Sequence, residues 1–351
     1  MKLILEKAVQ QLGQNLPFVI YKKPNHTTVN GIFQRNDSLF EATDFAENGF
    51  VFASFDGSKT LLIPENQSER ISAAFQKKEI TVLDKELGLT NITSKNNFET
   101  LVAKGIQAIE NKEFKKVVLS RKETLNLVDF DLVSAFEKMA QLYPTTFVYC
   151  FYHPKVGSWL GATPEQLLKA NNTEFKTIAL AGTQKDKGSD EVVWPKKEQE
   201  EQQFVTDYIV EKLKNVASEV VVSKPYSLKA GSIWHIKTDI SGTFNSSSSL
   251  REVVQLLHPT PAVCGFPKEN SKAFILENEN YDRTFYTGFL GELNIEDQTD
   301  LFVNLRCMEI GDSQVHLFMG CGITKDSIPE KEWEESSNKS ATMKKVLDFR
   351  F

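Results

Sequence analysis

The stretch that decides the fold is "DLFVNLRCMEIGDSQVHLFMGCGIT", residues 300–324. It contains two apolar runs, residues 300–310 and 313–324, with no helical segment between them. Each run has the length and composition of a β-strand. Consecutive strands without an intervening helix pair antiparallel, because a parallel pair needs a long crossover connection.

The segments before this stretch are also predicted from the spacing of their apolar residues. Apolar periods predict helices over 98–111 and 130–144 and strands over 116–121 and 146–152. Because strands come in adjacent runs instead of alternating strictly with helices, we predict an α+β fold with antiparallel sheets. Residues 1–97, a helix with short strands, form a scaffold part of the same domain, and residues 98–351 form the catalytic region.

Composition narrows the class of ligand. The 351 residues are 40% hydrophobic and 25% charged, with a net charge of -6. Without a basic surface the chain is expected to bind a small molecule, and neither nucleic acid nor a membrane. The apolar run at the N-terminus is too short for a signal peptide and no later run spans a bilayer, so we expect a cytoplasmic protein. Its four cysteines are expected to be reduced thiols.

The usual catalytic motifs are missing from the sequence. It has no dinucleotide or phosphate loop, no H-E-x-x-H and no G-x-S-x-G. The five histidines show no metal-ligand spacing. His235 is interpreted as a strand residue with a satisfied hydrogen bond, and a catalytic role is the lesser alternative.

Several charged residues stand where apolar ones are expected. Lys116 opens the strand "KVVLSR", and Arg306 lies within an apolar strand, where a buried guanidinium needs an anion. Glu165 follows a Thr-Pro turn, either as an acid in the first turn of a helix or as a general acid at the end of a strand. The glycines of "LAGT" and "MGCGI" offer backbone N–H groups that suit a carboxylate.

Two helices carry acids on an inward face. Glu201 shares a face with the apolar stripe Phe204, Val205, Tyr208, Ile209 and Leu213, and Glu332, Glu335 and Lys339 follow one another at helical spacing. Such acids suit Mg²⁺, which takes a few carboxylates, water and an anionic substrate. Equally, Glu335 and Lys339 form an ordinary surface pair and Glu201 is a first-turn acid.

The polar stretch 184–200 has two interpretations of equal weight. It is a mobile cover over a site, or a plain solvated loop.

Nine segments in this order resemble the chorismate-binding enzymes, and most of all the isochorismate synthases. The segments are "KVVLSR" (116–121), "GATPEQLL" (161–168), "IALAGT" (178–183), "KEQEEQQFV" (197–205), "LLHPTPAVCGFP" (256–267), "YDRTFYTGFLG" (281–291), "NLRC" (304–307), "LFMGCGI" (317–323) and "EWEESSNK" (332–339). Nine ordered segments are far more specific than a single motif.

The resemblance implies a fold, a reaction and roles for residues. The fold is two packed antiparallel β-sheets with helices outside. The reaction is the isomerisation of chorismate to isochorismate, with Lys116 as the base that activates water and Glu165 as the acid. Glu201 and Glu335 are expected to bind Mg²⁺, supported by Glu332. The implied substrate contacts are Arg306, Gly320, Gly322 and Lys339 for the carboxylates and Gly182 for the ring.

This sequence departs from the family pattern in places. Gln184 and Lys185 follow "AGT" where an arginine is common, which puts the local cover in doubt. Cys321 replaces a small alanine between two glycines, and we expect it to be a packing residue.

The resemblance also leaves related activities open. A salicylate synthase shares the lysine base, but such relatives tend to be longer. An anthranilate-type synthase generally has glutamine at the position of Lys116 and needs a glutaminase partner. For this chain we expect menaquinone biosynthesis, with a catechol siderophore as the alternative, and a monomer without an obligatory protein partner.

Overall fold

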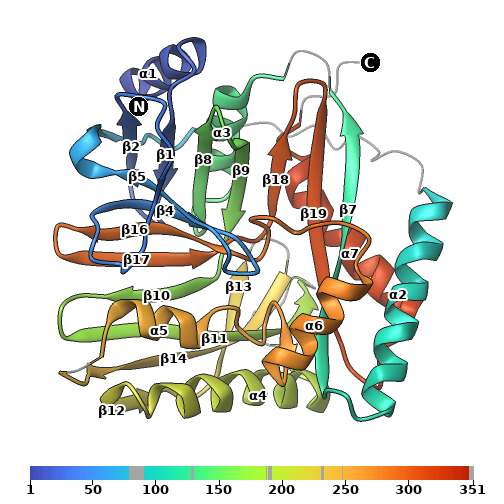
Figure 1. Ribbon diagram of the computed structural model, residues 1–351. Helices are drawn as coiled ribbons and strands as arrows, with labels where there is room; N and C mark the ends of the chain where they lie inside the picture. Colours follow the sequence, from blue (N-terminus) through green and yellow to red (C-terminus); the bar gives the residue numbers. More distant parts are fainter. Residues whose placement is uncertain are drawn as a thin grey trace.

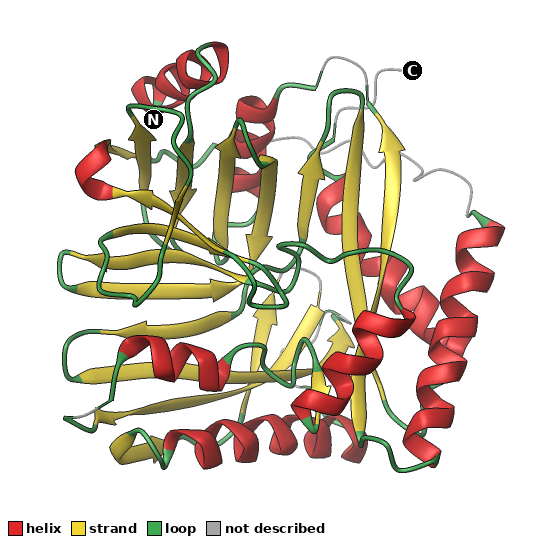
Figure 2. Cartoon of the chain, viewed as in Figure 1, coloured by secondary structure: helices red, strands yellow, loops and turns green. Residues whose placement is uncertain are grey.

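The computed structural model describes residues 1–78, 91–127, 130–186, 188, 192–230, 233–246 and 248–347. Its framework is two large sheets packed against each other, whose strands run across one another in Figure 1. Figure 2 shows the helices on the outside of these sheets. Every strand pair recorded in the described ranges is antiparallel, so the predicted α+β fold is confirmed.

The first sheet has nine strands and carries the "KVVLSR" segment near one edge. Its order is β15 (Gly265–Phe266), β7 (Lys116–Asn126), β19 (Gln314–Ile323), β18 (Cys307–Ile310), β9 (Gly157–Thr163), β8 (Phe147–His153), β1 (Phe18–Lys22), β2 (Thr28–Gln34) and β6 (Ser68–Ala74). The longest register in this sheet joins β7 to β19, from Val117 opposite Ile323 to Asn126 opposite Gln314.

The second sheet carries the "LAGT" segment. Its order is β12 (Ala217–Val222), β14 (Ile233–Phe244), β11 (Glu174–Lys185), β10 (Gln166–Ala170), β17 (Gln298–Val303), β16 (Phe289–Ile295), β4 (Gly49–Ala53), β5 (Thr60–Pro64) and β3 (Phe40–Glu41). A further strand, β13 (Tyr226–Ala230), pairs with β14. Strands from residues 1–78 therefore belong to both sheets.

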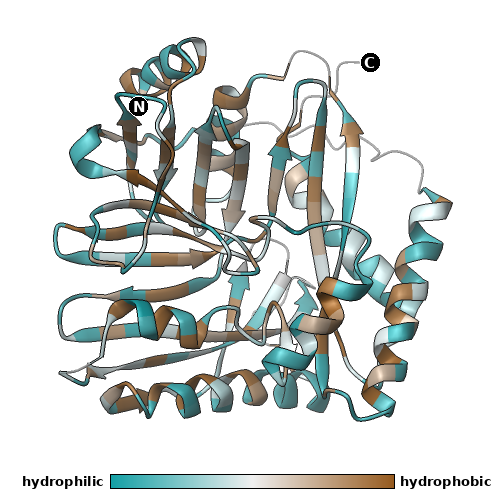
Figure 3. Cartoon of the chain, in the orientation of Figure 1, coloured by the Kyte–Doolittle hydropathy of each residue, from teal (hydrophilic) through white to brown (hydrophobic). Residues whose placement is uncertain are grey.

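The helices cover the outer faces of the two sheets. They are α1 (Lys2–Gly13), α2 (Ile92–Glu110), α3 (Leu132–Leu142), α4 (Lys196–Leu213), α5 (Leu250–Leu257), α6 (Lys268–Asn278) and α7 (Pro329–Lys344), with a 3₁₀ turn over Glu65–Gln67. Helix α7 packs on β19 and α2, and α4 packs on β11 and β14. In Figure 3, α2 and α4 carry both hydrophobic and hydrophilic residues, as helices with one buried face do. Within the described residues, no helix is both long and apolar enough to cross a membrane.

Aromatic side chains fill the space between the sheets. Phe52 from the second sheet lies 4.6 Å from Phe151 of the first and 4.4 Å from Phe285, measured between ring centroids. Trp159 stacks on Phe318 at 5.3 Å. Burying rings of this size is the largest single contribution to such a core.

The run 300–310 is not one strand, which corrects our prediction. Strand β17 ends at Val303 in the second sheet, and β18 begins at Cys307 in the first. Arg306 lies in the crossing between the sheets with φ of 48°, a left-handed conformation that cannot continue a strand. The antiparallel pair predicted with the following run is present, because Met308 of β18 lies opposite Leu317 of β19.

Two further predictions about local structure need correction. No helix begins at Glu165, which lies between the ends of β9 and β10. Phe204 does not belong to the buried stripe of α4, because it is 46% exposed. Val205, Tyr208, Ile209 and Leu213 are buried as predicted.

Candidate active site

A pocket opens where β7 and β19 of the first sheet meet β11 and β14 of the second. Helices α4 and α7 complete its wall, together with the loops that follow β9 and α5. The structure brings all ten of the predicted site residues to this one pocket: Lys116, Glu165, Gly182, Glu201, Arg306, Gly320, Gly322, Glu332, Glu335 and Lys339. They come from segments more than 200 residues apart.

Lys116 lies at the mouth of β7 with its ammonium inside the pocket. Its Nζ is 2.6 Å from Oε1 of Glu201 on α4, and its side chain is only 6% exposed. Gly322 on the neighbouring strand leaves room for this contact. A Cβ at Gly322 would lie 3.0 Å from both Glu201 Oε1 and Lys116 Cε, which is tighter than side chains normally pack.

Glu165 is buried in the turn between β9 and β10, and its backbone is fixed. Its carbonyl accepts the N–H of Val303 at 2.9 Å, and the hydroxyl of Thr163 donates to the carbonyl of Val303 at 2.6 Å. Burial raises the pKa of Glu165 to about 7, although Lys116 and a hydrogen bond from Thr260 act in the opposite direction. A carboxyl group with this pKa can supply a proton near neutral pH.

Arg306 and His235 form a second polar pair in the pocket. A guanidinium only donates, so His235 Nε2 accepts from Arg306 Nη2 at 3.3 Å, and Nδ1–H donates to the carbonyl of Gly182 at 2.9 Å. This arrangement requires a neutral imidazole. Burial and Arg306 agree with it, since they lower the pKa of His235 to about 3. In the described part of the chain Arg306 forms no salt bridge, so its guanidinium remains available to an anion.

Acidic side chains of α4 and α7 line the part of the pocket formed by these two helices. Lys339 Nζ lies 2.7 Å from Glu335 Oε1 and donates to the carbonyl of Gly320 at 2.8 Å. Glu335 and Lys339 form the i,i+4 pair of the second interpretation, but this pair lines the pocket, and Mg²⁺ binding by Glu335 stays a prediction. Burial and the neighbouring Glu335 raise the pKa of Glu332.

Glu198 is an additional acid at this place that the sequence interpretation missed. Its Oε2 is buried and has no hydrogen-bond partner among the residues that the structure describes. Glu198 lines the same pocket as Glu201, Glu332 and Glu335, and a buried, unpaired carboxylate oxygen suits a hard divalent cation, for which carboxylate oxygens are the preferred ligands. The signal was its position, one helical turn before Glu201 on the same face of α4.

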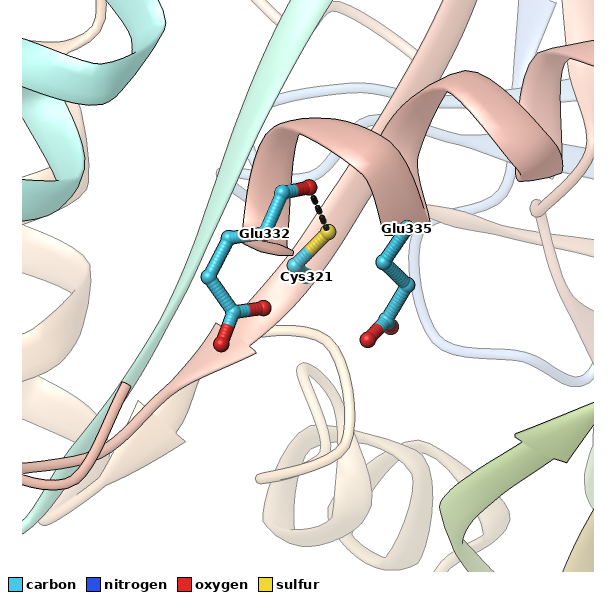
Figure 4. Close-up of side chains that lie close together, drawn as sticks. All are labelled: Cys321, Glu332 and Glu335. Atoms are coloured by element: carbon cyan, nitrogen blue, oxygen red, sulfur yellow. Dashed lines mark hydrogen bonds between the residues drawn. The ribbon is translucent and has the colours of Figure 1, made fainter. Parts of the chain in front are cut away.

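Cys321 lies close to two of these acids but belongs to the core. One ligand atom from each of Cys321, Glu332 and Glu335 lies within 4.8 Å of the others. Figure 4 shows the three side chains and the hydrogen bond between the Cys321 sulfur and the backbone of Glu332. However, the thiol donates to the backbone carbonyl of Glu332 at 3.2 Å, and burial raises its pKa well above the ordinary value. Its side chain packs with Val102 and Leu119, on the face of β19 opposite the pocket.

A family model described as "Chorismate binding enzyme" matches residues 53–348. The chain belongs to the chorismate-binding enzymes. The resemblance seen in the nine sequence segments is thereby confirmed.

Curated relatives of this chorismate-binding enzyme are named isochorismate synthases. It is 32% identical over 274 residues to isochorismate synthase EntC of Escherichia coli (strain K12), a match that covers 73% of this chain and 68% of EntC. It is 29% identical over 262 residues to isochorismate synthase MenF of Pasteurella multocida, with 70% of this chain and 60% of MenF covered.

Solved structures share the fold. The menaquinone-specific isochorismate synthase MenF from Escherichia coli superimposes with a TM-score of 0.81 at 22% identity, over 95% of this chain and 89% of that one. Anthranilate synthase component I from Streptococcus pneumoniae gives 0.70 at 17% identity, over 93% and 89%.

The predicted cover over the site is only partly described. Of the stretch 184–200, residues 187 and 189–191 lie outside the described residues. The two ends are not loop, since Gln184 and Lys185 end β11, and α4 begins at Lys196. Between them Trp194 Nε1 donates to Ser227 Oγ at 2.9 Å, which ties the stretch to β13.

Proposed function

We propose that this chorismate-binding enzyme is an isochorismate synthase, an isomerase that adds water at C2 of chorismate and removes the hydroxyl at C4. The observation that carries this proposal is the shared pocket of Lys116 and Glu165, which places a lysine and a carboxyl of raised pKa beside receivers for anions. The names of EntC and MenF agree with it.

The proton transfers assign one role to each group. Water attacks C2 and gives a proton to Lys116, while Glu165 gives a proton to the C4 hydroxyl, which leaves as water. One water enters and one leaves, so the formula of the substrate is unchanged. Because the pKa of Glu165 is about 7, a large fraction of the enzyme carries the required proton at neutral pH.

The contact between Lys116 and Glu201 sets a further condition on the role of Lys116 as the base. The lysine Nζ lies 2.6 Å from Oε1 of Glu201, so the lysine can turn toward the attacking water only when Glu201 turns to another partner. Glu201 is one of the residues that would hold Mg²⁺, so a bound ion would be such a partner.

Mg²⁺ would be held by Glu201 and Glu335, with Glu198 and Glu332 supporting them. Bound there, the ion would supply positive charge for the ring carboxylate of the substrate. Arg306, Lys339 and the backbone at Gly320 and Gly322 would receive the second carboxylate, and Gly182 would lie against the ring.

The biological setting is part of the proposal. We place the reaction in menaquinone biosynthesis, because the structure of a menaquinone-specific isochorismate synthase is similar to this chain. Biosynthesis of a catechol siderophore is the alternative. The enzyme would act in the cytoplasm as a monomer without an obligatory protein partner. A growth test of a deletion strain under menaquinone-requiring and iron-limited conditions separates the two pathways.

The deciding experiment is incubation of the purified protein with chorismate and Mg²⁺, with and without ammonium, followed by product identification by chromatography and NMR. Isochorismate in equilibrium with chorismate is the expected result. Salicylate with pyruvate would instead identify a salicylate synthase, and an aromatic amine formed only with ammonium would identify an anthranilate-type synthase. No consumption of chorismate would refute all three.

A further inference from the structure

A buried ion pair lies behind the pocket and is not used by the proposed chemistry. Glu279 at the end of α6 and Arg283 in the loop that follows are 9% and 3% exposed. Their side chains form a bidentate contact, with Nε donating to Oε2 at 2.7 Å and Nη2 donating to Oε1 at 2.6 Å. A pair of this kind combines charge with a fixed geometry.

Arg283 uses its three other N–H groups on three separate walls of the pocket. Nη2 donates to the carbonyl of Val118 on β7 at 2.7 Å, and Nη1 donates to the carbonyl of Val263 at 3.0 Å and to Oγ1 of Thr287 at 3.2 Å. All three acceptors belong to residues that line the pocket. The five donors of the guanidinium are thus fully used.

Glu279 holds the same strand at a second point. Its Oε1 accepts the backbone N–H of Ser120 at 2.7 Å and the Ser120 hydroxyl at 2.9 Å. Ser120 lies directly opposite Gly320 in the β7–β19 register. Lys116 belongs to the same strand, so the pair fixes the strand that carries the proposed base.

Thr287, in one of these walls, has a backbone conformation that threonine rarely adopts. It is fully buried with φ of 61°, a conformation that is a genuine outlier for a β-branched residue. Its N–H donates to the carbonyl of Asn304 at 2.8 Å, and its hydroxyl donates to the carbonyl of Tyr286 at 2.6 Å. Strain of this kind persists only where the surroundings fix it, and it is concentrated at functional sites.

From these contacts we infer that Glu279 and Arg283 are a positioning pair. They fix three walls of the pocket relative to one another: β7 with Lys116, the loop with Val263, and the turn with Thr287. The inference rests on the proposed function, because it concerns the geometry that the reaction requires. Misplacement of a wall by about 1 Å can cost on the order of 10²-fold in rate.

The test compares Arg283→Lys, Thr287→Gly and the matched control Tyr21→Phe. Lysine keeps the charge at 283 but has three donors on a point charge, so it cannot hold all the acceptors. Tyr21 donates to the buried Glu292 far from these walls, so Tyr21→Phe weakens a buried contact without touching the pocket. For each variant we would measure kcat, KM, Tm and hydrogen exchange.

Two results are expected for a positioning pair. In Arg283→Lys, hydrogen exchange increases together in peptides covering 116–121, 260–264 and 284–288, and kcat falls by about 10²-fold while KM changes far less. In Thr287→Gly the relieved backbone strain and the lost buried side chain act on Tm in opposite directions, and kcat falls because the Oγ1 acceptor of Arg283 Nη1 is lost from this wall. Tyr21→Phe lowers Tm alone.

Other results would overturn the inference. It is wrong if Arg283→Lys lowers Tm but leaves kcat and the exchange of the three walls as in the wild type. It is also wrong if Thr287→Gly is fully active. Failure of the proposed function looks different: the wild-type protein itself would leave chorismate unchanged, and hydrogen exchange would still decide whether the pair holds the three walls.

Discussion

At the scale of single residues, the two proposed proton carriers occupy different environments. Lys116 is paired with Glu201, whereas among the described residues the hydrogen bond recorded for the Glu165 carboxyl group is a long one, 3.5 Å from the Thr260 hydroxyl. Burial disfavours the charge of the glutamate and raises its pKa to about 7, so the acid is already protonated in part near neutral pH. The lysine must instead be released from its contact with Glu201 before it can face the attacking water.

Replacing the lysine tests the first role. In Lys116→Ala the base is lost but the receivers of the carboxylates remain, so turnover should fall by about 10²- to 10⁴-fold while calorimetry still detects chorismate binding. Lys115→Ala is the matched control, because its side chain is the exposed neighbour of Lys116. Turnover of Lys116→Ala close to that of the wild type would contradict the assignment.

The pKa of Glu165 predicts that turnover and stability both fall as the pH rises. Turnover needs its protonated form, so kcat should decline as the pH rises through about 7. Stability changes too, because the folded pKa lies above the ordinary value of 4.5: both states bind the proton below pH 4.5, and the folded state is progressively penalised between pH 4.5 and 7.

Glu165→Gln removes both effects at once. It should be inactive, yet at pH 8 it should be more stable than the wild type by about 2 to 3 kcal/mol, with little difference at pH 4.5. Urea unfolding at the two pH values measures this. A variant that is less stable than the wild type at pH 8 would show that the buried carboxyl group is not penalised.

At the scale of elements, helices α4 and α7 each contribute proposed Mg²⁺ ligands to the lining of the pocket. Glu335→Ala should raise the Mg²⁺ concentration needed for half-maximal turnover and weaken Mg²⁺ binding measured by calorimetry. Glu334→Ala on the exposed face of α7 should leave both unchanged. Identical Mg²⁺ titrations for Glu335→Ala and the wild type would argue against the metal role.

Helix α3 offers a prediction about stability alone. Asp131 caps its N-terminus by accepting the backbone N–H groups of Val133 and Ser134, both at 3.0 Å. Asp131→Ala should cost about 1 kcal/mol of unfolding free energy without changing kcat, because the helix lies outside the pocket. Denaturant unfolding and the product assay together measure this, and a loss of activity in the folded variant would contradict it.

Some helices and strands could be predicted from the sequence, and others could not. Local patterns predicted β7, α3 and α4, because apolar periodicity and caps act within one segment. The break between β17 and β18 was not predicted, because it depends on the path of the chain between two sheets and on the left-handed conformation of Arg306. His235 was predicted as a hydrogen-bonded strand residue, but only the packing of β14 against Arg306 places it in the pocket.

At the scale of the molecule, the site depends on both sheets being complete. The ten predicted residues were singled out by their charge or their place in the chain, and the resemblance assigned their roles, since spacing alone left those of Glu201 and Glu335 open. Glu198 was not predicted although it lies one helical turn before Glu201, because Glu200 and Glu201 are acidic as well and its buried oxygen is visible only in the structure. Long-range packing therefore selects among acids that look alike in sequence.

The last prediction concerns the residues that the sequence suggested to be a scaffold. Strands β1, β2 and β6 extend the first sheet, β3, β4 and β5 extend the second, and Phe50 and Phe52 lie in the core between them. A fragment of residues 98–351 would expose β8 and β16, each of which loses a paired strand, along with the aromatic core. It should therefore aggregate or lack cooperative unfolding.

Expression of this fragment beside the full chain, followed by size-exclusion chromatography and thermal unfolding, tests the expectation. Adding residues 1–97 as a separate polypeptide is the informative control. Recovery of soluble, active protein in the mixture would show that the two segments fold as one unit, because only the native pairing restores both sheets. A fragment 98–351 that unfolds cooperatively and converts chorismate by itself would show instead that the catalytic region is an independent domain.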